Sequence, residues 1–179
     1  RLKGERFFEV YNGHPAVHNL GDSTRMGYEA MWDFINIAYL EKGQPLIFGL
    51  ATDDSHNYHK QGATFSNAGR GWVVVEADSL EAGTLVEAME RGDFYASTGV
   101  ELEKLSYENN VLEVAALPKD GVNYTLEFIG CKEGEKDTQV LKTVEGNAGS
   151  FEVSADLLFV RCKITSSEPQ HNPVENMKN

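Results

Sequence analysis

Apolar and polar residues alternate along this chain with two different periods, and the change falls near residue 100. Before that point, short apolar runs alternate with stretches in which apolar residues recur every three or four positions, the spacing of one face of a helix. After it, short runs alternate apolar and polar residues with a period of two, as half-buried strands do. The first pattern predicts an α/β domain and the second an all-β domain.

The first part contains three apolar runs that end in turn residues and are predicted to be strands. They lie at residues 7–11, 46–51 and 71–77. Runs with so few polar residues are typical of strands buried on both faces of a parallel sheet. One helix is expected after an N-cap at residues 22–24, and a second from Ser79 to a stop at Gly92. The apolar residues expected to turn the first helix toward the core are Met26, Ala30, Met31, Phe34, Ile35 and Ala38.

The second part reads as a series of short strands separated by turn residues, which predicts an immunoglobulin-like β-sandwich. The expected strands lie at residues 100–105, 111–114, 124–130, 139–144, 150–153 and 157–165. We therefore divide the chain into an α/β part at residues 1–101 and a sandwich at 102–168. A polar, proline-containing tail at 169–179 is expected to be extended or disordered.

The charge balance narrows the classes of partner. The chain has 28 acidic and 16 basic residues and a net charge of -12, which disfavours nucleic acid as a partner. No apolar run approaches the ~18 residues of a membrane helix, so we expect no membrane partner.

Cys131 and Cys162 fall inside predicted strands, where we favour two buried thiols over a disulfide, and both alternatives stay open.

The candidate chemistry follows the second predicted strand. Asp54 and His56 are two residues apart, and in an extended backbone such side chains point the same way and can converge on one cation. Carboxylate with imidazole suits Zn²⁺, Mn²⁺ or Fe²⁺. His14, His18 and His59 also lie just beyond strand ends, where α/β folds place their sites. The alternative for the Asp-x-His pair is a capped turn with a surface histidine.

Three segments together resemble one branch of the polymerase-and-histidinol-phosphatase (PHP) family. They are Glu9 to His14, Ala51 to His56 and Gly92 to Gly99, in that order. The resemblance implies the C-terminal part of a distorted (β/α)7 PHP-type barrel that holds two or three divalent metal ions and hydrolyses phosphate esters. Asp54 and His56 match the family's last metal-binding motif.

The same resemblance implies that part of the site lies elsewhere. The family's first motif, a His-x-His, and the ligands that follow it have no counterpart in this sequence. The chain also begins at Arg1 without a signal-peptide pattern. We therefore expect a missing N-terminal half to be the partner that completes the site, and this fragment alone to be inactive.

Further residues near the Asp-x-His pair are candidates for contact with a small phosphorylated substrate. His14 and His59 are candidate catalytic residues, and Asn12 and Arg70 candidate substrate-binding residues. Each has a plainer alternative: a turn-forming Asn-Gly with a satisfied histidine, an exposed loop histidine and a solvated basic residue. Asp53 either orients a ligating imidazole or caps the loop, and a carboxylate at Glu9, inside an apolar strand, needs a polar partner.

Two other functions compete with the phosphoesterase. The first is a non-catalytic binding or scaffold protein in which the site is degenerate. The second is a deaminase or amidohydrolase-like enzyme, which would also use histidine and aspartate at strand ends. A His-x-His motif upstream would support the phosphoesterase, and its absence would support the scaffold.

Overall fold

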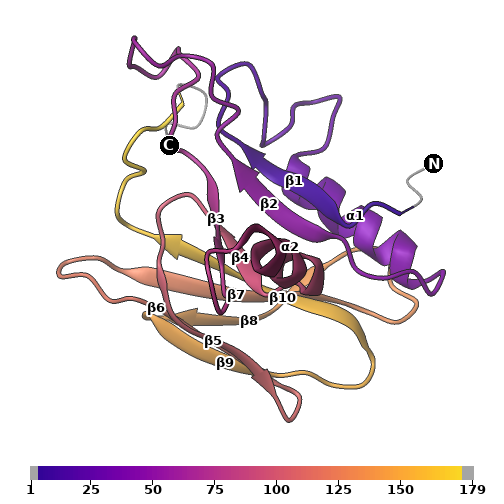
Figure 1. The fold of residues 1–179 in the computed structure, drawn as a ribbon. Coiled ribbons are helices and arrows are strands. Elements are labelled where there is room, and N and C mark those ends of the chain that lie inside the picture. Colours follow the sequence, from indigo (N-terminus) through magenta and orange to yellow (C-terminus); the bar gives the residue numbers. More distant parts are fainter. Residues whose placement is uncertain (1–3, 175–179) are drawn as a thin grey trace. The chain divides into compact units, whose positions relative to one another are not determined.

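The protein is described by a computed structural model that covers residues 4–174. These residues fall into two compact units, whose elements are labelled in Figure 1. The first unit contains the residues up to Tyr39, Gln44–Gly99 and the residues from Gln170 onward, and the second contains Leu40–Gly43 and Val100–Pro169. Of the tail expected at 169–179, residues 170–174 belong to the first unit, where Gln170 donates hydrogen bonds to Tyr11 and to the Arg70 carbonyl, and residues 175–179 lie outside the described residues. Neither described helix is long and apolar enough to cross a membrane.

Two small sheets and two helices make up the first unit. β1 (Phe7–Asn12) and β2 (Phe48–Thr52) run parallel, and α1 (Tyr28–Leu40) connects them in the sequence. β3 (Trp72–Val75) and β4 (Phe94–Ser97) run antiparallel, and α2 (Ala82–Arg91) connects them. β4 is a strand that the sequence pattern did not predict.

An aromatic cluster joins the two sheets of the first unit. The rings of Phe7, Phe48 and Phe94 come from β1, β2 and β4, and their centroids lie 5.8 to 6.4 Å apart. Aromatic pairs at such separations pack favourably in tilted and edge-on arrangements. The cluster therefore gives a unit with little regular sheet an apolar centre of its own.

The predicted barrel is wrong. The described residues are mostly β, with two helices, small sheets and no barrel. The strand-helix alternation was misleading because β3 pairs with β4 in antiparallel fashion, whereas a barrel of this class needs parallel strands with a neighbour on each side. Only β1 and β2 form the expected parallel pair.

The first helix also buries a different face from the one expected. Its buried residues are Asp33, Asn36 and Ile37, whereas Phe34 is exposed. The amide of Asn36 accepts a hydrogen bond from the Ile47 backbone N–H at 2.8 Å and donates to the Ile47 carbonyl at 3.2 Å. A buried amide with both partners satisfied is tolerated in a core, so polar pairing overrode the apolar pattern here.

Two antiparallel sheets of three strands each make up the second unit. Their strands are β5 (Leu102–Glu108), β6 (Val111–Ala116), β7 (Tyr124–Lys132), β8 (Gln139–Glu145), β9 (Ala148–Glu152) and β10 (Leu157–Ser166). The sheet orders are β5-β6-β9 and β10-β7-β8. An immunoglobulin fold has at least seven strands, so the predicted immunoglobulin-like sandwich is corrected to a smaller all-β unit.

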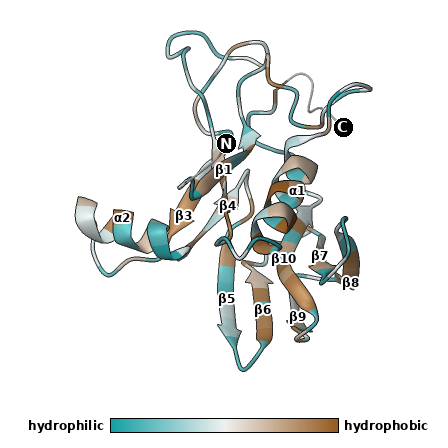
Figure 2. Cartoon of the chain, turned by 90° about the vertical axis from the view of Figure 1, so that its right-hand side faces the viewer, coloured by the Kyte–Doolittle hydropathy of each residue, from teal (hydrophilic) through white to brown (hydrophobic). Residues whose placement is uncertain are grey.

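The core of the second unit joins one strand of each sheet. Val114 and Ala116 of β6 are buried with Tyr124, Leu126 and Phe128 of β7. Figure 2 shows β6 mostly in the brown of apolar residues, whereas the edge strand β5 is largely white and teal. The central strands therefore carry the core, and polar residues cover the edge.

Both cysteines are free thiols. Cys131 is buried, and burial raises the pKa of the Cys162 thiol to about 11. At neutral pH both side chains therefore behave as small apolar groups.

Two glycines of the α2 region should respond oppositely to alanine. Gly92 ends α2 with φ 88°, and a Cβ there would lie 2.4 Å from the Phe48 ring, whereas a Cβ at Gly83 would meet nothing within 4 Å. We expect Gly92→Ala to lower the free energy of unfolding by at least about 1–2 kcal/mol, and Gly83→Ala to raise it by up to about 1 kcal/mol. Trp32 and Trp72 both lie in the first unit, so urea unfolding followed by tryptophan fluorescence reports on it. Equal shifts in the same direction would contradict the packing at Gly92.

Candidate functional site

The loops that follow β1 and β2 start at the same end of the parallel pair (Figure 1). Asn12 and Thr52 are register partners at the strand ends, and the pairing continues one residue further, with Gly13 N–H donating to the Thr52 carbonyl at 2.8 Å. A Cβ at Gly13 would lie 2.8 Å from the Arg70 Cβ, so this close approach needs glycine. The pairing places residues that follow β1 beside those that follow β2.

Asp54 is held in an unusual backbone conformation with a half-exposed side chain. Its φ is 47°, in the left-handed region that few residues other than glycine adopt. One carboxylate oxygen, Oδ2, accepts a hydrogen bond from Asn12 Nδ2 at 3.2 Å. The other, Oδ1, lies 3.5 Å from the Nδ1 of His56.

One ring nitrogen of His56 is held by a contact with the backbone. Its Nδ1 lies 2.7 Å from the backbone carbonyl of Asp54. A carbonyl oxygen only accepts, so Nδ1 carries the proton and the lone pair of the neutral ring is on Nε2. Many metal-binding histidines are oriented by this kind of backbone contact. The side chain is 67% exposed, so Nε2 is the nitrogen that a cation would reach.

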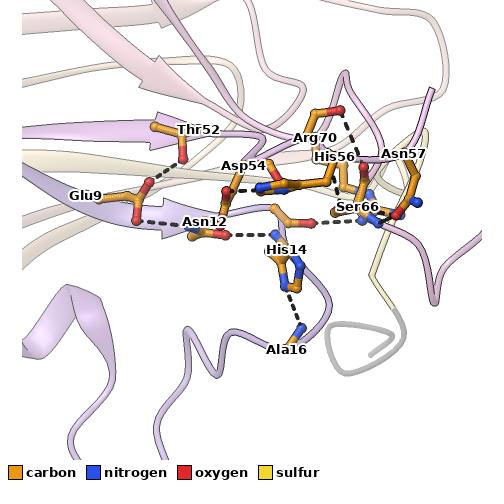
Figure 3. Close-up of polar contacts among 12 residues, drawn as sticks. Glu9, Asn12, His14, Ala16, Thr52, Asp54, His56, Asn57, Ser66 and Arg70 are labelled. Atoms are coloured by element: carbon orange, nitrogen blue, oxygen red, sulfur yellow. Dashed lines mark hydrogen bonds and ion pairs between the residues drawn. The ribbon is translucent and has the colours of Figure 1, made fainter.

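His14 presents the opposite tautomer. The backbone N–H of Ala16 donates to His14 Nδ1 at 3.1 Å, which leaves the ring proton on Nε2. The rings of His14 and His56 meet edge to face, with centroids 5.8 Å apart and planes at 88° (Figure 3). His14 therefore offers a hydrogen-bond donor on a ring that lies beside the ring of His56.

Asn12 is a predicted substrate-binding residue, but its side-chain amide makes hydrogen bonds to other groups of the protein. Its Nδ2 donates to Glu9 Oε2 at 3.0 Å and to Asp54 Oδ2, and its Oδ1 accepts from the His14 backbone N–H at 2.8 Å. The Glu9 carboxylate also accepts a hydrogen bond from the Thr52 hydroxyl (Figure 3). The polar partner expected for Glu9 is thus present. Thr52 was not singled out from the sequence, because it reads as the end of an apolar strand.

Arg70, expected to bind phosphate, is fully buried. Its guanidinium donates to three backbone carbonyls: Nη1 to Gly13 at 2.8 Å, Nη2 to Gly62 at 3.0 Å and Nε to Asn172 at 2.9 Å. These contacts hold the loop after β1, the loop after β2 and the C-terminal segment together. A phosphate outside the loop would not reach this guanidinium.

The remaining candidates on the loop differ in how firmly they are held. His59 is exposed. Asp53 caps the far end of the loop, because its carboxylate accepts hydrogen bonds from the backbone N–H groups of Gly69, Arg70 and Gly71 at 2.6 to 2.9 Å. Burial alone would raise the pKa of Asp53, but these donors and the nearby Arg70 charge outweigh it and lower the pKa.

Asp54 Oδ1 and His56 Nε2 are acceptor atoms that could each bind a divalent cation, whereas the contact between the two side chains joins Oδ1 to the proton-bearing Nδ1 at 3.5 Å. Both groups are accessible, and their donor atoms are of the type that Zn²⁺, Mn²⁺ and Fe²⁺ accept. Within residues 4–174, no group of three or more His, Cys, Asp or Glu side chains could hold a metal ion. A comparison of the chain with models of protein families, curated proteins and solved structures gives no match.

Replacing Asp53 with asparagine should destabilise the loop in a pH-dependent way. Because folding lowers the pKa of Asp53, its contribution to stability is present above the ordinary aspartate pKa of about 4. That contribution disappears as the pH falls through the folded-state pKa. We expect Asp53→Asn to cost about 1–3 kcal/mol at pH 7, and the difference from the wild type to shrink in acid.

The matched control is Asp78→Asn, an exposed aspartate of the same unit, which should change stability by less than about 0.5 kcal/mol. Urea unfolding followed by tryptophan fluorescence at a series of pH values measures both variants. A pH-independent loss in Asp53→Asn would contradict the role of its charge.

Proposed function

We propose that this chain provides two metal ligands of a phosphoesterase that hydrolyses small phosphate esters with the help of divalent metal ions. The observation that carries the proposal is the meeting of Asp54 and His56 with His14 at one end of the β1–β2 pair. A carboxylate, an imidazole lone pair and an imidazole N–H lie together there on an accessible surface. The resemblance of residues 9–14, 51–56 and 92–99 to the PHP family supports the same chemistry.

The role of each residue follows from whether the atom it presents is a hydrogen-bond acceptor or donor. Asp54 Oδ1 and His56 Nε2 would hold a cation, since both are acceptor atoms. A bound divalent cation lowers the pKa of its water to about 7 and stabilises negative charge on phosphate. His14 Nε2–H would donate a hydrogen bond to a phosphate oxygen and so stabilise its negative charge.

Two ligands do not complete a site of this class. Zinc in catalytic sites takes three protein ligands, and the residues described supply Asp54 and His56 only. The proposal therefore requires a companion polypeptide segment that brings further ligands, and a His-x-His pair is the motif that the resemblance leads us to expect there.

A non-catalytic scaffold is the second candidate. It is favoured by one observation, that residues 4–174 hold no group of three metal-binding side chains. In that case the polar network at the strand ends would serve only to shape the loops. Metal binding by Asp54 and His56 separates the two candidates.

Zn²⁺ titration of the full chain, followed by ¹⁵N NMR of the imidazole nitrogens, tests this binding. We expect Zn²⁺ to shift the Nε2 resonance of His56 while Nδ1 keeps its proton. Asp54→Asn and His56→Gln should each weaken binding more than about tenfold, whereas His18→Ala, which removes an exposed histidine of the same unit, should not. Binding that is unchanged in the Asp54 and His56 variants would favour the scaffold.

The activity itself is measured by hydrolysis of p-nitrophenyl phosphate with Zn²⁺ or Mn²⁺. We expect hydrolysis when a companion segment carrying the missing ligands is added to this chain. Asp54→Ala or His56→Ala should abolish it, because each removes a ligand. Hydrolysis that survives both substitutions would contradict the assignment of these residues.

A further inference from the structure

The side chain of Asn12 links two carboxylates and the loop after β1. It is nearly buried, at 6% exposure, and it lies between two carboxylates, those of Glu9 and Asp54. Its backbone is fixed independently, because Asn19 accepts from the Asn12 N–H at 2.8 Å and donates to the Asn12 carbonyl at 2.9 Å. The amide group is therefore held at one place and in one direction.

The partners of this amide determine which way round it sits. An asparagine amide has two N–H donors on nitrogen and none on oxygen. Nitrogen faces the two carboxylates, and oxygen faces the N–H of His14. Reversing the amide would set its oxygen against two carboxylates and its nitrogen against another donor. The observed orientation is the one that satisfies all three partners.

The Asn12 amide also makes the two carboxylate oxygens of Asp54 different from each other. Oδ2 is taken up by Asn12, and Oδ1 is left toward His56. Asp54 has a left-handed backbone, its side chain is 40% exposed, and the Asn12 amide donates a hydrogen bond to its carboxylate. If the Asp54 carboxylate rotated, both of its oxygens could bind a cation. While Asn12 bonds to Oδ2, only Oδ1 is available.

We propose that Asn12 is a positioning residue rather than a substrate-binding one. It makes Asp54 a ligand through Oδ1 only, and by bonding to both Asp54 and the His14 N–H it links the loop after β2 to the loop after β1. The ligand part rests on the proposed function, whereas the hydrogen bond between Asn12 and Asp54 does not.

The metal-free chain tests the hydrogen bond by NMR of the Asn12 side-chain amide. Because one amide proton faces Asp54 and the other faces Glu9, we expect Asp54→Asn to shift mainly one of the two proton resonances. The Asp54 side chain is 40% exposed, so this variant should fold. Asn12 amide protons that do not respond to Asp54→Asn would overturn the proposal.

The Zn²⁺-bound chain tests the one-oxygen ligand by infrared spectroscopy of ¹³C-aspartate, with the Asp54 bands identified by subtracting Asp54→Asn. A carboxylate bound through one oxygen has widely separated stretching bands, and one bound through both has narrowly separated bands. We expect wide separation in the wild type and narrow separation in Asn12→Ala, with Zn²⁺ affinity reduced about 10- to 100-fold. A merely structural role would lower affinity without changing the band separation.

Thr52→Val is the matched control, because it removes another hydrogen bond to the Glu9 carboxylate without altering the Asn12 amide. It should keep the wide separation. Narrow bands in the wild type, or wide bands in Asn12→Ala, would overturn the proposal. Zn²⁺ that leaves the Asp54 bands unchanged in the wild type would overturn the ligand part, while a response of the Asn12 protons to Asp54→Asn would still establish the hydrogen bond.

Discussion

Parallel hydrogen bonding between β1 and β2 brings the residues that follow each strand to one end of the same small sheet. Asn12 pairs with Thr52, and the extra bond from Gly13 to the Thr52 carbonyl keeps the two chains together beyond the strand ends. Without this pairing, Asp54 would have no amide donor and His14 would not meet His56. Two features depend on it: the direction of the Asp54 carboxylate and the approach of the His14 ring to the His56 ring.

A buried cation holds the loops that carry these groups. Arg70 is surrounded by backbone carbonyls, and Asp53, which carries the nearby negative charge, accepts from the Arg70 backbone N–H. Burying an arginine is tolerated when its N–H donors find acceptors, and here they find them in three separate segments. The loop between β2 and β3 is thus ordered by polar contacts rather than by an apolar core. This explains why a sequence so rich in Asn, Ser and Gly at residues 55–71 can present side chains in a defined arrangement.

The local elements were readable from the sequence, but their assembly was not. Apolar runs located β1, β2 and β3, and Gly92 located the end of α2, because these signals act over a few residues. Strand direction depends on distant partners, so the antiparallel pairing of β3 with β4 left no trace in the pattern. The Asp-x-His spacing drew attention to Asp54 and His56, and the need of Glu9 for a polar partner was foreseen. The burial of Arg70 was not, because a basic residue in a glycine-rich loop reads the same whether it is solvated or enclosed.

The claim that the strand pairing assembles the site is tested most directly by the proximity of the His14 and His56 imidazoles in the metal-free chain. Nuclear Overhauser cross-peaks between their ring C–H protons measure it, with assignments from His14→Ala and His56→Gln. The edge-to-face arrangement at 5.8 Å between centroids predicts such cross-peaks, and they should vanish in either variant. Resolved resonances for both rings with no cross-peak between them would show that the two loops do not meet, and would contradict this account.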